Sequence, residues 1–162
     1  MFDKEIFDLR ISGLSEAMQL SEQWATHTVS LLDPDINSEI IKLPRPNREG
    51  LLQRYFFHDI TPTTFTKLFK DFKPATSEQI VEILEFTAPL KPTNRLLIHC
   101  HAGVSRSTAV ACGVLCQHGL TPNEAVKHVF SIRKQAFPNR HILKLFDNIL
   151  ELKGELVAAG EY

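Results

Sequence analysis

Four short runs along the chain have the residue pattern of β-strands, since they are dense in β-branched, aromatic and leucine residues. These runs predict strands at Ile6–Ile11, His27–Leu32, Arg54–Ile60 and Arg95–His99. Between and after them, apolar residues recur at helical spacing. This second pattern predicts helices at Leu14–Gln23, from Thr76 or Ser77 to the residue before Pro89, at Arg106–His118, from Thr121 to about Lys134, and at Asn139–Lys153.

The order of these elements predicts the fold class. Strands and helices alternate first and helices close the chain, which favours an α/β fold with a small, largely parallel central sheet flanked by helices. No internal repeat, low-complexity tract or linker rich in Gly and Ser divides the sequence. Because 162 residues suit one hydrophobic core, we expect a single domain over residues 1–162.

Composition and charge narrow the range of partners. The formal net charge of −1 gives no electrostatic reason to expect nucleic acid or an anionic membrane as a partner. The three cysteines are sparse and odd in number, which fits a reducing cytosol better than a disulfide framework. The opening residues have neither the basic start nor the apolar run of a secretory signal. We therefore expect a cytoplasmic protein; the sequence does not indicate its oligomeric state.

A short loop between the predicted strand Arg95–His99 and the helix from Arg106 carries the candidate chemistry. In open parallel sheets, ligands bind at the carboxyl ends of strands. A helix N-terminus there also offers unpaired N–H groups and the positive end of its dipole to an anion. The sequence therefore predicts a phosphate-binding loop made of His101, Ala102, Gly103, Val104, Ser105 and Arg106.

Residues in and beside this loop suit attack on phosphorus. The helix dipole that favours phosphate also favours the thiolate of Cys100, which is the nucleophilic form of a cysteine. Arg106 can fold back and hold two phosphoryl oxygens with its planar fork. Gly103 allows a backbone conformation in which successive N–H groups point inward. Ser107 supplies a hydroxyl near the sulfur, able to steady the thiolate.

The string HCHAGVSRS closely resembles the signature of the dual-specificity branch of the protein tyrosine phosphatases. Further similarity covers the strand SLLDPD, the segment FHDI and the tail RKQAFPNRHILKLFD. The resemblance implies a protein-tyrosine-phosphatase-like fold in which Cys100 is the nucleophile and Arg106 binds phosphate. It implies a phosphorylated protein or peptide as partner, with phosphotyrosine as substrate and phosphoserine and phosphothreonine as further candidates. No metal ion or cofactor is expected.

Phosphate-ester cleavage also needs an acid for the leaving oxygen and later a base for the attacking water. The resemblance implies an aspartate upstream of the cysteine, and Asp59 at the end of the predicted strand Arg54–Ile60 is our candidate. If this strand is parallel to Arg95–His99, both strands end at the same edge of the sheet. Asp71 is the alternative, because it lies nearer to Cys100 in the sequence. An enlarged loop from Thr61 to Pro74 would account for the longer separation of Asp59.

The remaining cysteines and two further aspartates are expected to be structural. Cys112 and Cys116 lie four residues apart on a helix rich in alanine and valine, which indicates core packing. Asp33 and Asp35 flank Pro34 directly after a predicted strand and are typical of a turn.

The histidines do not form a predicted metal site. His99 and His101 flank Cys100, but no paired Cys or His cluster elsewhere in the sequence has the spacing of a zinc site. We expect His99 to orient the loop through hydrogen bonds. His58, beside Asp59, either lines the cleft or lies on the outer face.

Three alternatives to a protein phosphatase remain at this point. A phospho-binding module would keep the loop but lack a correctly positioned acid. Rhodanese-like and arsenate-reducing proteins also have a cysteine before an anion-binding loop, although Arg106, Ser107 and the C-terminal helices favour the phosphatase. A phosphoinositide phosphatase is less expected, because enzymes of that type favour lysines inside the loop. The corresponding positions here are His101, Ala102, Val104 and Ser105.

Overall fold

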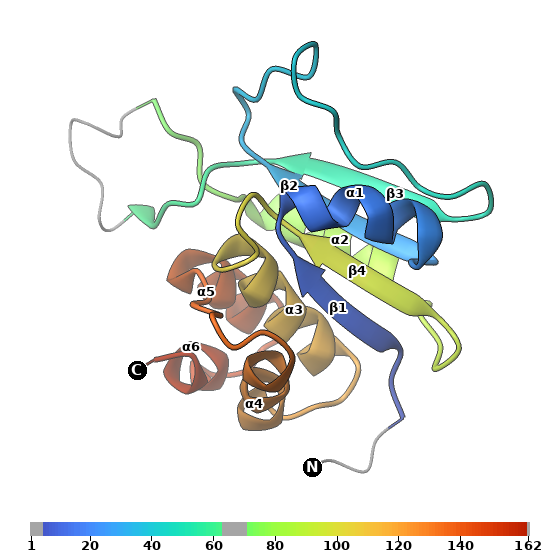
Figure 1. Cartoon of the computed structure of the whole chain (residues 1–162). Helices are drawn as coiled ribbons and strands as arrows, with labels where there is room; N and C mark the ends of the chain where they lie inside the picture. Colours follow the sequence, from blue (N-terminus) through green and yellow to red (C-terminus); the bar gives the residue numbers. More distant parts are fainter. Residues whose placement is uncertain (1–4, 63–70, 162) are drawn as a thin grey trace.

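The computed structural model describes residues 5–62 and 71–161. Within these ranges one sheet has the strand order β1-β4-β2-β3, and every pairing in it is parallel. Its strands are β1 (Asp8–Ser12), β4 (Arg95–His99), β2 (His27–Leu32) and β3 (Leu51–Phe56). Because the strands are parallel, their carboxyl ends all lie at one edge of the sheet (Figure 1). The predicted α/β fold with a parallel sheet is confirmed.

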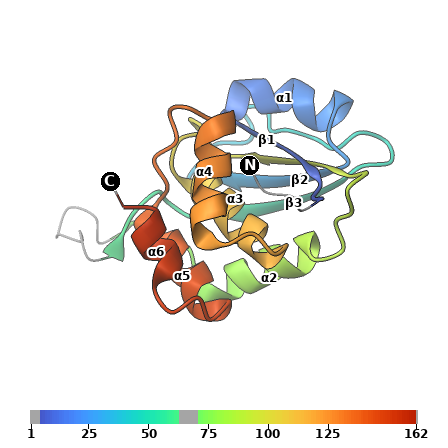
Figure 2. The ribbon, with the colours of Figure 1, turned by 90° about the horizontal axis from the view of Figure 1, so that it is seen from below.

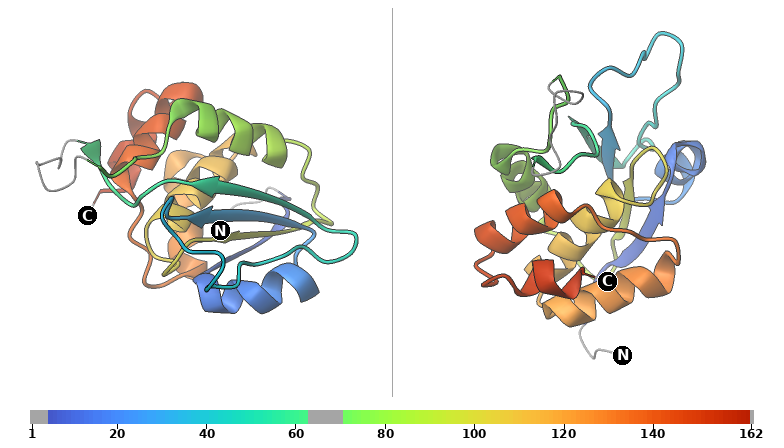
Figure 3. Two further views of the ribbon diagram at one scale, coloured as in Figure 1. Left: turned by 90° about the horizontal axis from the view of Figure 1, so that it is seen from above. Right: turned by 90° about the vertical axis from the view of Figure 1, so that its left-hand side faces the viewer.

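Helices cover both faces of this sheet, as Figure 2 and the left panel of Figure 3 show. Among the described helices, α1 (Leu14–Gln23) covers one face. On the opposite side α2 (Ser77–Thr87) and α3 (Arg106–Gln117) lie against the sheet. Outside them, α4 (Pro122–Ile132) and α5 (Arg140–Ile149) pack on α3, and α6 (Glu155–Ala159) packs on α4 and α5. Among the described residues, no helix is both long enough and apolar enough to cross a membrane.

The core has two parts because β4 is buried on both faces. Its side chains alternate between the faces, as strand geometry requires. Leu96 and Ile98 join the large apolar cluster on the side of α2 to α6. Leu97 packs with Ala17 and Ala25 on the side of α1. The middle of β4, Leu96 to Ile98, is therefore continuously apolar rather than alternating.

Helix starts follow the expected capping signals. Thr121 precedes α4 and accepts a hydrogen bond from Glu124 N through Oγ1, while the Glu124 side chain accepts one from Thr121 N. Thr76 and Gln79 form the same reciprocal pair before α2. These bonds satisfy N–H groups that a helix N-terminus otherwise leaves unpaired.

The third strand lies earlier than Arg54–Ile60, the range that the sequence predicts. Its pairing with β2 begins at Leu51, opposite His27. The last sheet bond is donated by Phe57 N to Leu32 O, and the next backbone group, His58 N, donates to Lys73 O instead. The chain therefore leaves the sheet before Asp59, so this residue lies beyond the strand end rather than on it.

The last predicted helix is shorter than expected, and a further short helix follows it. The range Asn139–Lys153 contains α5, which ends at Ile149, and a turn in which Glu151 and Lys153 have positive φ values of 56° and 58°. After this turn, the buried carboxylate of Asp147 accepts bonds from the backbone N–H groups of Gly154, Leu156 and Val157. These bonds hold the start of α6, which periodicity alone did not predict. The first strand is displaced slightly from its predicted bounds, to Asp8–Ser12.

Gly113, inside α3, leads to a prediction about stability. An added Cβ would lie 2.2 Å from the ring of Phe146 on α5, so the glycine permits close packing of the two helices. Gly113→Ala should therefore destabilise the fold by roughly 1–3 kcal/mol, the usual cost of overpacking, although alanine normally favours a helix. Urea unfolding measures the change. In the Phe146→Leu background the cost should shrink; an equally stable or stabilised Gly113→Ala protein would contradict this packing.

Candidate active site

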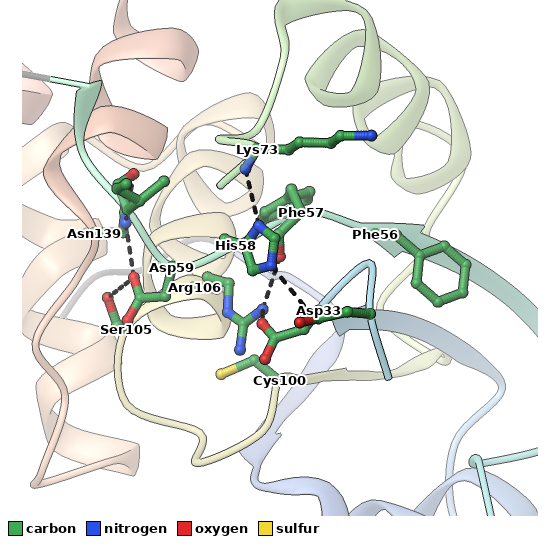
Figure 4. Close-up of polar contacts among 12 residues, drawn as sticks. Asp33, Phe56, Phe57, His58, Asp59, Lys73, Cys100, Ser105, Arg106 and Asn139 are labelled. Atoms are coloured by element: carbon green, nitrogen blue, oxygen red, sulfur yellow. Dashed lines mark hydrogen bonds and ion pairs between the residues drawn. The ribbon is translucent and has the colours of Figure 1, made fainter. Parts of the chain in front are cut away.

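The loop that joins β4 to α3 lies at the carboxyl edge of the sheet. Cys100 follows directly after β4 and is 3% exposed, and Arg106, the first residue of α3, is 5% exposed. Figure 4 shows the side chains of Cys100, Arg106 and Asp33 at this edge, where Arg106 pairs with Asp33. The structure thus brings together the predicted cysteine and arginine.

Consecutive carbonyl groups of the loop point away from its centre, because each accepts a hydrogen bond from the surrounding scaffold. The pairs are His101 O with Leu14 N (2.9 Å), Ala102 O with Arg133 Nη2 (3.1 Å), Gly103 O with Arg133 Nε (2.9 Å), Val104 O with Phe137 N (2.8 Å) and Ser105 O with Asn139 N (3.0 Å). The donors come from the start of α1, the end of α4 and the segment before α5.

Gly103 is required at the tightest point of this loop. Its φ of 69° is a backbone conformation that residues with a side chain rarely adopt. An added Cβ would also lie 2.5 Å from Arg133 Nη2 and 2.6 Å from the Ser12 carbonyl carbon. The Ala102 carbonyl faces outward, so the N–H of the same peptide group, which is that of Gly103, points inward and donates to Cys100 Sγ at 3.2 Å. The expectation of an inward-pointing N–H is met at this residue.

The sulfur of Cys100 has a second polar neighbour. Ser107 Oγ lies 3.1 Å from Cys100 Sγ, and Ser107 is fully buried. The hydroxyl and the Gly103 N–H can both donate to a thiolate, and hydrogen bonds to the charged form stabilise it. The predicted proximity of Ser107 to the sulfur is therefore present in the structure.

Arg106 is held by two acceptors on the same nitrogen. Nη1 donates to Asp33 Oδ1 at 2.7 Å and to the backbone oxygen of Phe57 at 2.8 Å. These acceptors follow the ends of β2 and β3, so the carboxyl edge of the sheet anchors the guanidinium.

Asp33 has a position that the sequence did not suggest. It begins the expected turn, since Ile36 N donates to its backbone oxygen at 3.2 Å, but its side chain also pairs with Arg106. The position of Asp33 beside Arg106 follows from the order of the strands in the sheet. Because β2 lies beside β4 in the sheet, the residue after β2 and the loop after β4 are neighbours. That adjacency could not be read from the turn pattern alone.

Asp59 lies against the loop, while Asp71 does not. Asp59 Oδ1 accepts hydrogen bonds from Ser105 Oγ and from Asn139 Nδ2, both at 2.7 Å (Figure 4). Asn139 also caps α5 by accepting from Ile142 N at 2.9 Å, so its amide is fixed from both sides. Asp71 is exposed, and within the described ranges it has no hydrogen bond to the loop. Of the expected enlarged loop, residues 63–70 lie outside the described part of the chain.

His99 holds the backbone of Cys100 from behind. Its Nδ1 lies 3.1 Å from Cys100 O and its Nε2 lies 2.6 Å from Ser30 Oγ. A carbonyl oxygen only accepts, so Nδ1 carries the proton and Nε2 accepts from the hydroxyl. Ser30 Oγ in turn accepts from Arg54 Nε at 3.2 Å. Burial lowers the pKa of His99 to about 4, with Arg54 and Arg106 adding to the effect, so the ring is neutral at pH 7.

His58 lies between the loops that surround the site. Its Nδ1 accepts from Lys73 N at 2.8 Å, its Nε2 lies 3.3 Å from Asp35 Oδ1, and its ring stacks on Phe72. The side chain is 11% exposed. His58 therefore fixes the segment that contains both Phe57 and Asp59, instead of projecting from the outer face.

Cys112 and Cys116 belong to the core, as their spacing indicated. Both pack with the large apolar cluster, and Cys112 is fully buried. Burial raises the pKa of the Cys112 thiol, and burial together with the Asp147 carboxylate raises the pKa of Cys116 to about 12. Both thiols are therefore protonated at neutral pH.

The comparisons with known proteins identify the fold. No protein-family model matches the sequence, and no curated protein sequence matches it either. Solved structures do match. They include human DUSP28 (21% identity, 90% of this chain and 94% of that chain, TM-score 0.56) and Tk-PTP in the active form (21%, 93% and 95%, 0.57). PTPMT1 in complex with PI(5)P is similar as well (17% identity, 95% of each chain, TM-score 0.59). The chain thus has the fold of the dual-specificity branch of the protein tyrosine phosphatases, as the loop sequence implied.

Proposed function

We propose that this protein is a cytoplasmic, cysteine-dependent phosphatase that hydrolyses phosphotyrosine monoesters in proteins, with phosphoserine and phosphothreonine as further substrates. The reaction would proceed through a cysteinyl-phosphate intermediate and would need no metal ion. The observation that carries the proposal is the polar environment of one sulfur. Cys100 Sγ accepts a hydrogen bond from Gly103 N at 3.2 Å and lies 3.1 Å from Ser107 Oγ, at the N-terminus of α3.

In the first step, the Cys100 thiolate attacks phosphorus while the bond from phosphorus to the tyrosine oxygen breaks. Asp59, in its protonated form, gives its proton to that leaving oxygen. Asp59 suits this role because Ser105 and Asn139 both bind Oδ1. Within the described residues Oδ2 has no hydrogen bond, so it is the oxygen available for proton transfer.

In the second step, water attacks the phosphocysteine. Asp59, now a carboxylate, takes a proton from the water, and the bond between sulfur and phosphorus breaks. The Gly103 N–H and the Ser107 hydroxyl can then again donate hydrogen bonds to the released Cys100 thiolate. Throughout both steps, Arg106 and the inward N–H groups of the loop would hold the phosphoryl oxygens, as preorganised donors do for developing charge.

The loop residues favour a protein substrate over a phosphoinositide. The similar PTPMT1 structure contains PI(5)P, but the loop of this chain has His101, Ala102, Val104 and Ser105 where lysines would favour a multiply charged lipid headgroup. The formal net charge of −1 likewise gives no support for binding an anionic membrane.

The alternative of a phospho-binding module without turnover needs an absent or misplaced acid. The contacts of Asp59 with Ser105 and Asn139 argue against that condition, since they hold a carboxyl group at the loop. Catalysis is therefore the function that these contacts favour.

Cys100→Ser tests the nucleophile. The serine hydroxyl remains protonated, so turnover should fall to background while the protein stays folded and still binds phosphate. Release of nitrophenol from an aryl phosphate measures turnover. The parent should also release one equivalent in an initial burst. Cys112→Ser, in the core, is the matched control and should remain active. Activity of the Cys100→Ser protein within about tenfold of the parent, roughly 1.4 kcal/mol, would rule out this nucleophile.

Selective alkylation tests the thiolate. Iodoacetamide at pH 6–7 should modify Cys100 first, because the raised pKa values of Cys112 and Cys116 keep those thiols protonated. Inorganic phosphate should slow the modification of Cys100. Peptide mapping by mass spectrometry identifies the modified residue. Modification of Cys116 before Cys100 would show that the loop does not activate its cysteine.

Asp59→Asn and Asp71→Asn together test the acid. Loss of a positioned acid should slow phosphotyrosine hydrolysis by about 10²–10⁴-fold. An ester with a highly activated leaving group should be affected much less, since its leaving oxygen needs no proton. Asp71→Asn should change neither rate, because Asp71 is exposed and has no described contact with the loop. The reverse pattern would transfer the role to Asp71.

A further inference from the structure

The guanidinium of Arg106 has five N–H donors, and the structure shows how they are divided. Both hydrogens of Nη1 are used, one by Asp33 Oδ1 and one by the backbone oxygen of Phe57. In the part of the chain that the structure describes, Nε and Nη2 have no hydrogen-bond partner. These two nitrogens form one edge of the guanidinium, with parallel N–H bonds that match two oxygens of a phosphoryl group.

The two acceptors on Nη1 are fixed to different degrees. The oxygen of Phe57 belongs to the backbone just after β3, where Phe57 N is still bonded to the sheet. Asp33 contributes a side chain, which is 46% exposed, while the Arg106 side chain is 6% exposed. A substitution at position 33 can therefore alter one anchor of the guanidinium and leave the other in place.

We propose that Asp33 is a positioning residue for the phosphate-binding arginine: by occupying Nη1, it turns the free Nε–Nη2 edge toward the centre of the loop. Without Asp33, the Phe57 oxygen would be the only acceptor on Nη1, and the guanidinium could rotate about that single hydrogen bond. The Asp33 carboxylate supplies a second hydrogen bond, and the two bonds together fix the plane of the guanidinium. The proposal rests on the proposed function, because it assigns Arg106 to the phosphoryl group.

The geometry also explains why a carboxylate can lie beside an anion site. Asp33 and the bound oxyanion would contact different edges of one cation rather than compete for the same N–H groups. Removal of the carboxylate would thus have two opposing effects on anion affinity. Loss of the repulsion between Asp33 and the anion would raise the affinity, while loss of the orientation of Arg106 would lower it. A positioning role requires that the second effect is the larger one.

The test measures the binding of tungstate, a phosphate analogue, by calorimetry, so it does not require turnover. Asp33→Ala should raise the dissociation constant tenfold or more. Asp33→Asn should stay within threefold of the parent, because the amide oxygen still accepts from Nη1. The matched control is Asp35→Ala, two residues away, whose side chain is 81% exposed and pairs with His58 rather than Arg106. It should bind tungstate like the parent.

A double-mutant cycle isolates the route through Arg106. Lysine cannot form the fork, so in the Arg106→Lys background Asp33→Ala should change the dissociation constant by less than twofold. Thermal unfolding of each variant identifies a purely structural role, which would lower the melting temperature without changing tungstate affinity. Unchanged or tighter binding by Asp33→Ala would overturn the proposal. An equal tenfold loss in both backgrounds, or an Asn variant as weak as the Ala variant, would overturn it as well.

A parent protein that binds tungstate but does not hydrolyse phosphotyrosine would contradict the proposed function alone. The effect of Asp33 on tungstate affinity would still be measurable in that case. The two proposals therefore fail in distinguishable ways.

Discussion

The outward hydrogen bonds of the loop carbonyls are the constraint on which the rest of the site depends. Peptide groups are rigid, so a carbonyl that bonds to the scaffold commits its peptide N–H to the opposite side. The carbonyls of five successive loop residues, from His101 to Ser105, are bonded in this way. Arg133 supplies two of the donors, and its Nη1 in turn lies 3.7 Å from Oε1 of Glu16 on α1. The loop is thus shaped by α1, α4 and the segment before α5, which are distant in sequence.

The carboxyl edge of the parallel sheet supplies the polar groups that complete the site. The loop after β4 contributes the sulfur, the residue after β2 contributes Asp33, and the segment after β3 contributes Phe57 O and Asp59. A buried polar group destabilises the fold unless it has a hydrogen-bond partner. In this site, residues that serve as such partners also hold other parts of the structure in place. Asn139 caps α5 and binds Asp59, and His99 holds Cys100 while it packs inside the core. The site and the fold are therefore stabilised by the same bonds.

Much of the fold could be predicted because its signals are local. The strand and helix bounds around the loop, the caps at Thr76 and Thr121 and the positions of Cys100 and Arg106 follow from short stretches of sequence. The short helix α6 could not be predicted, since its start depends on three backbone N–H groups that donate to the Asp147 carboxylate. Asp33 was missed for a similar reason. Its role depends on which strands are neighbours, and strand order is not encoded in any single segment.

The central claim is that phosphorus becomes bonded to the sulfur of Cys100. The most direct measurement is rapid acid quench of the protein during hydrolysis of a phosphotyrosine peptide, followed by mass spectrometry of the peptide that contains Cys100. The account predicts that this peptide gains the mass of one phosphoryl group within the first turnover and loses it as substrate is exhausted. Steady hydrolysis with no phosphate on Cys100 at any time, or with phosphate on another residue, would contradict it.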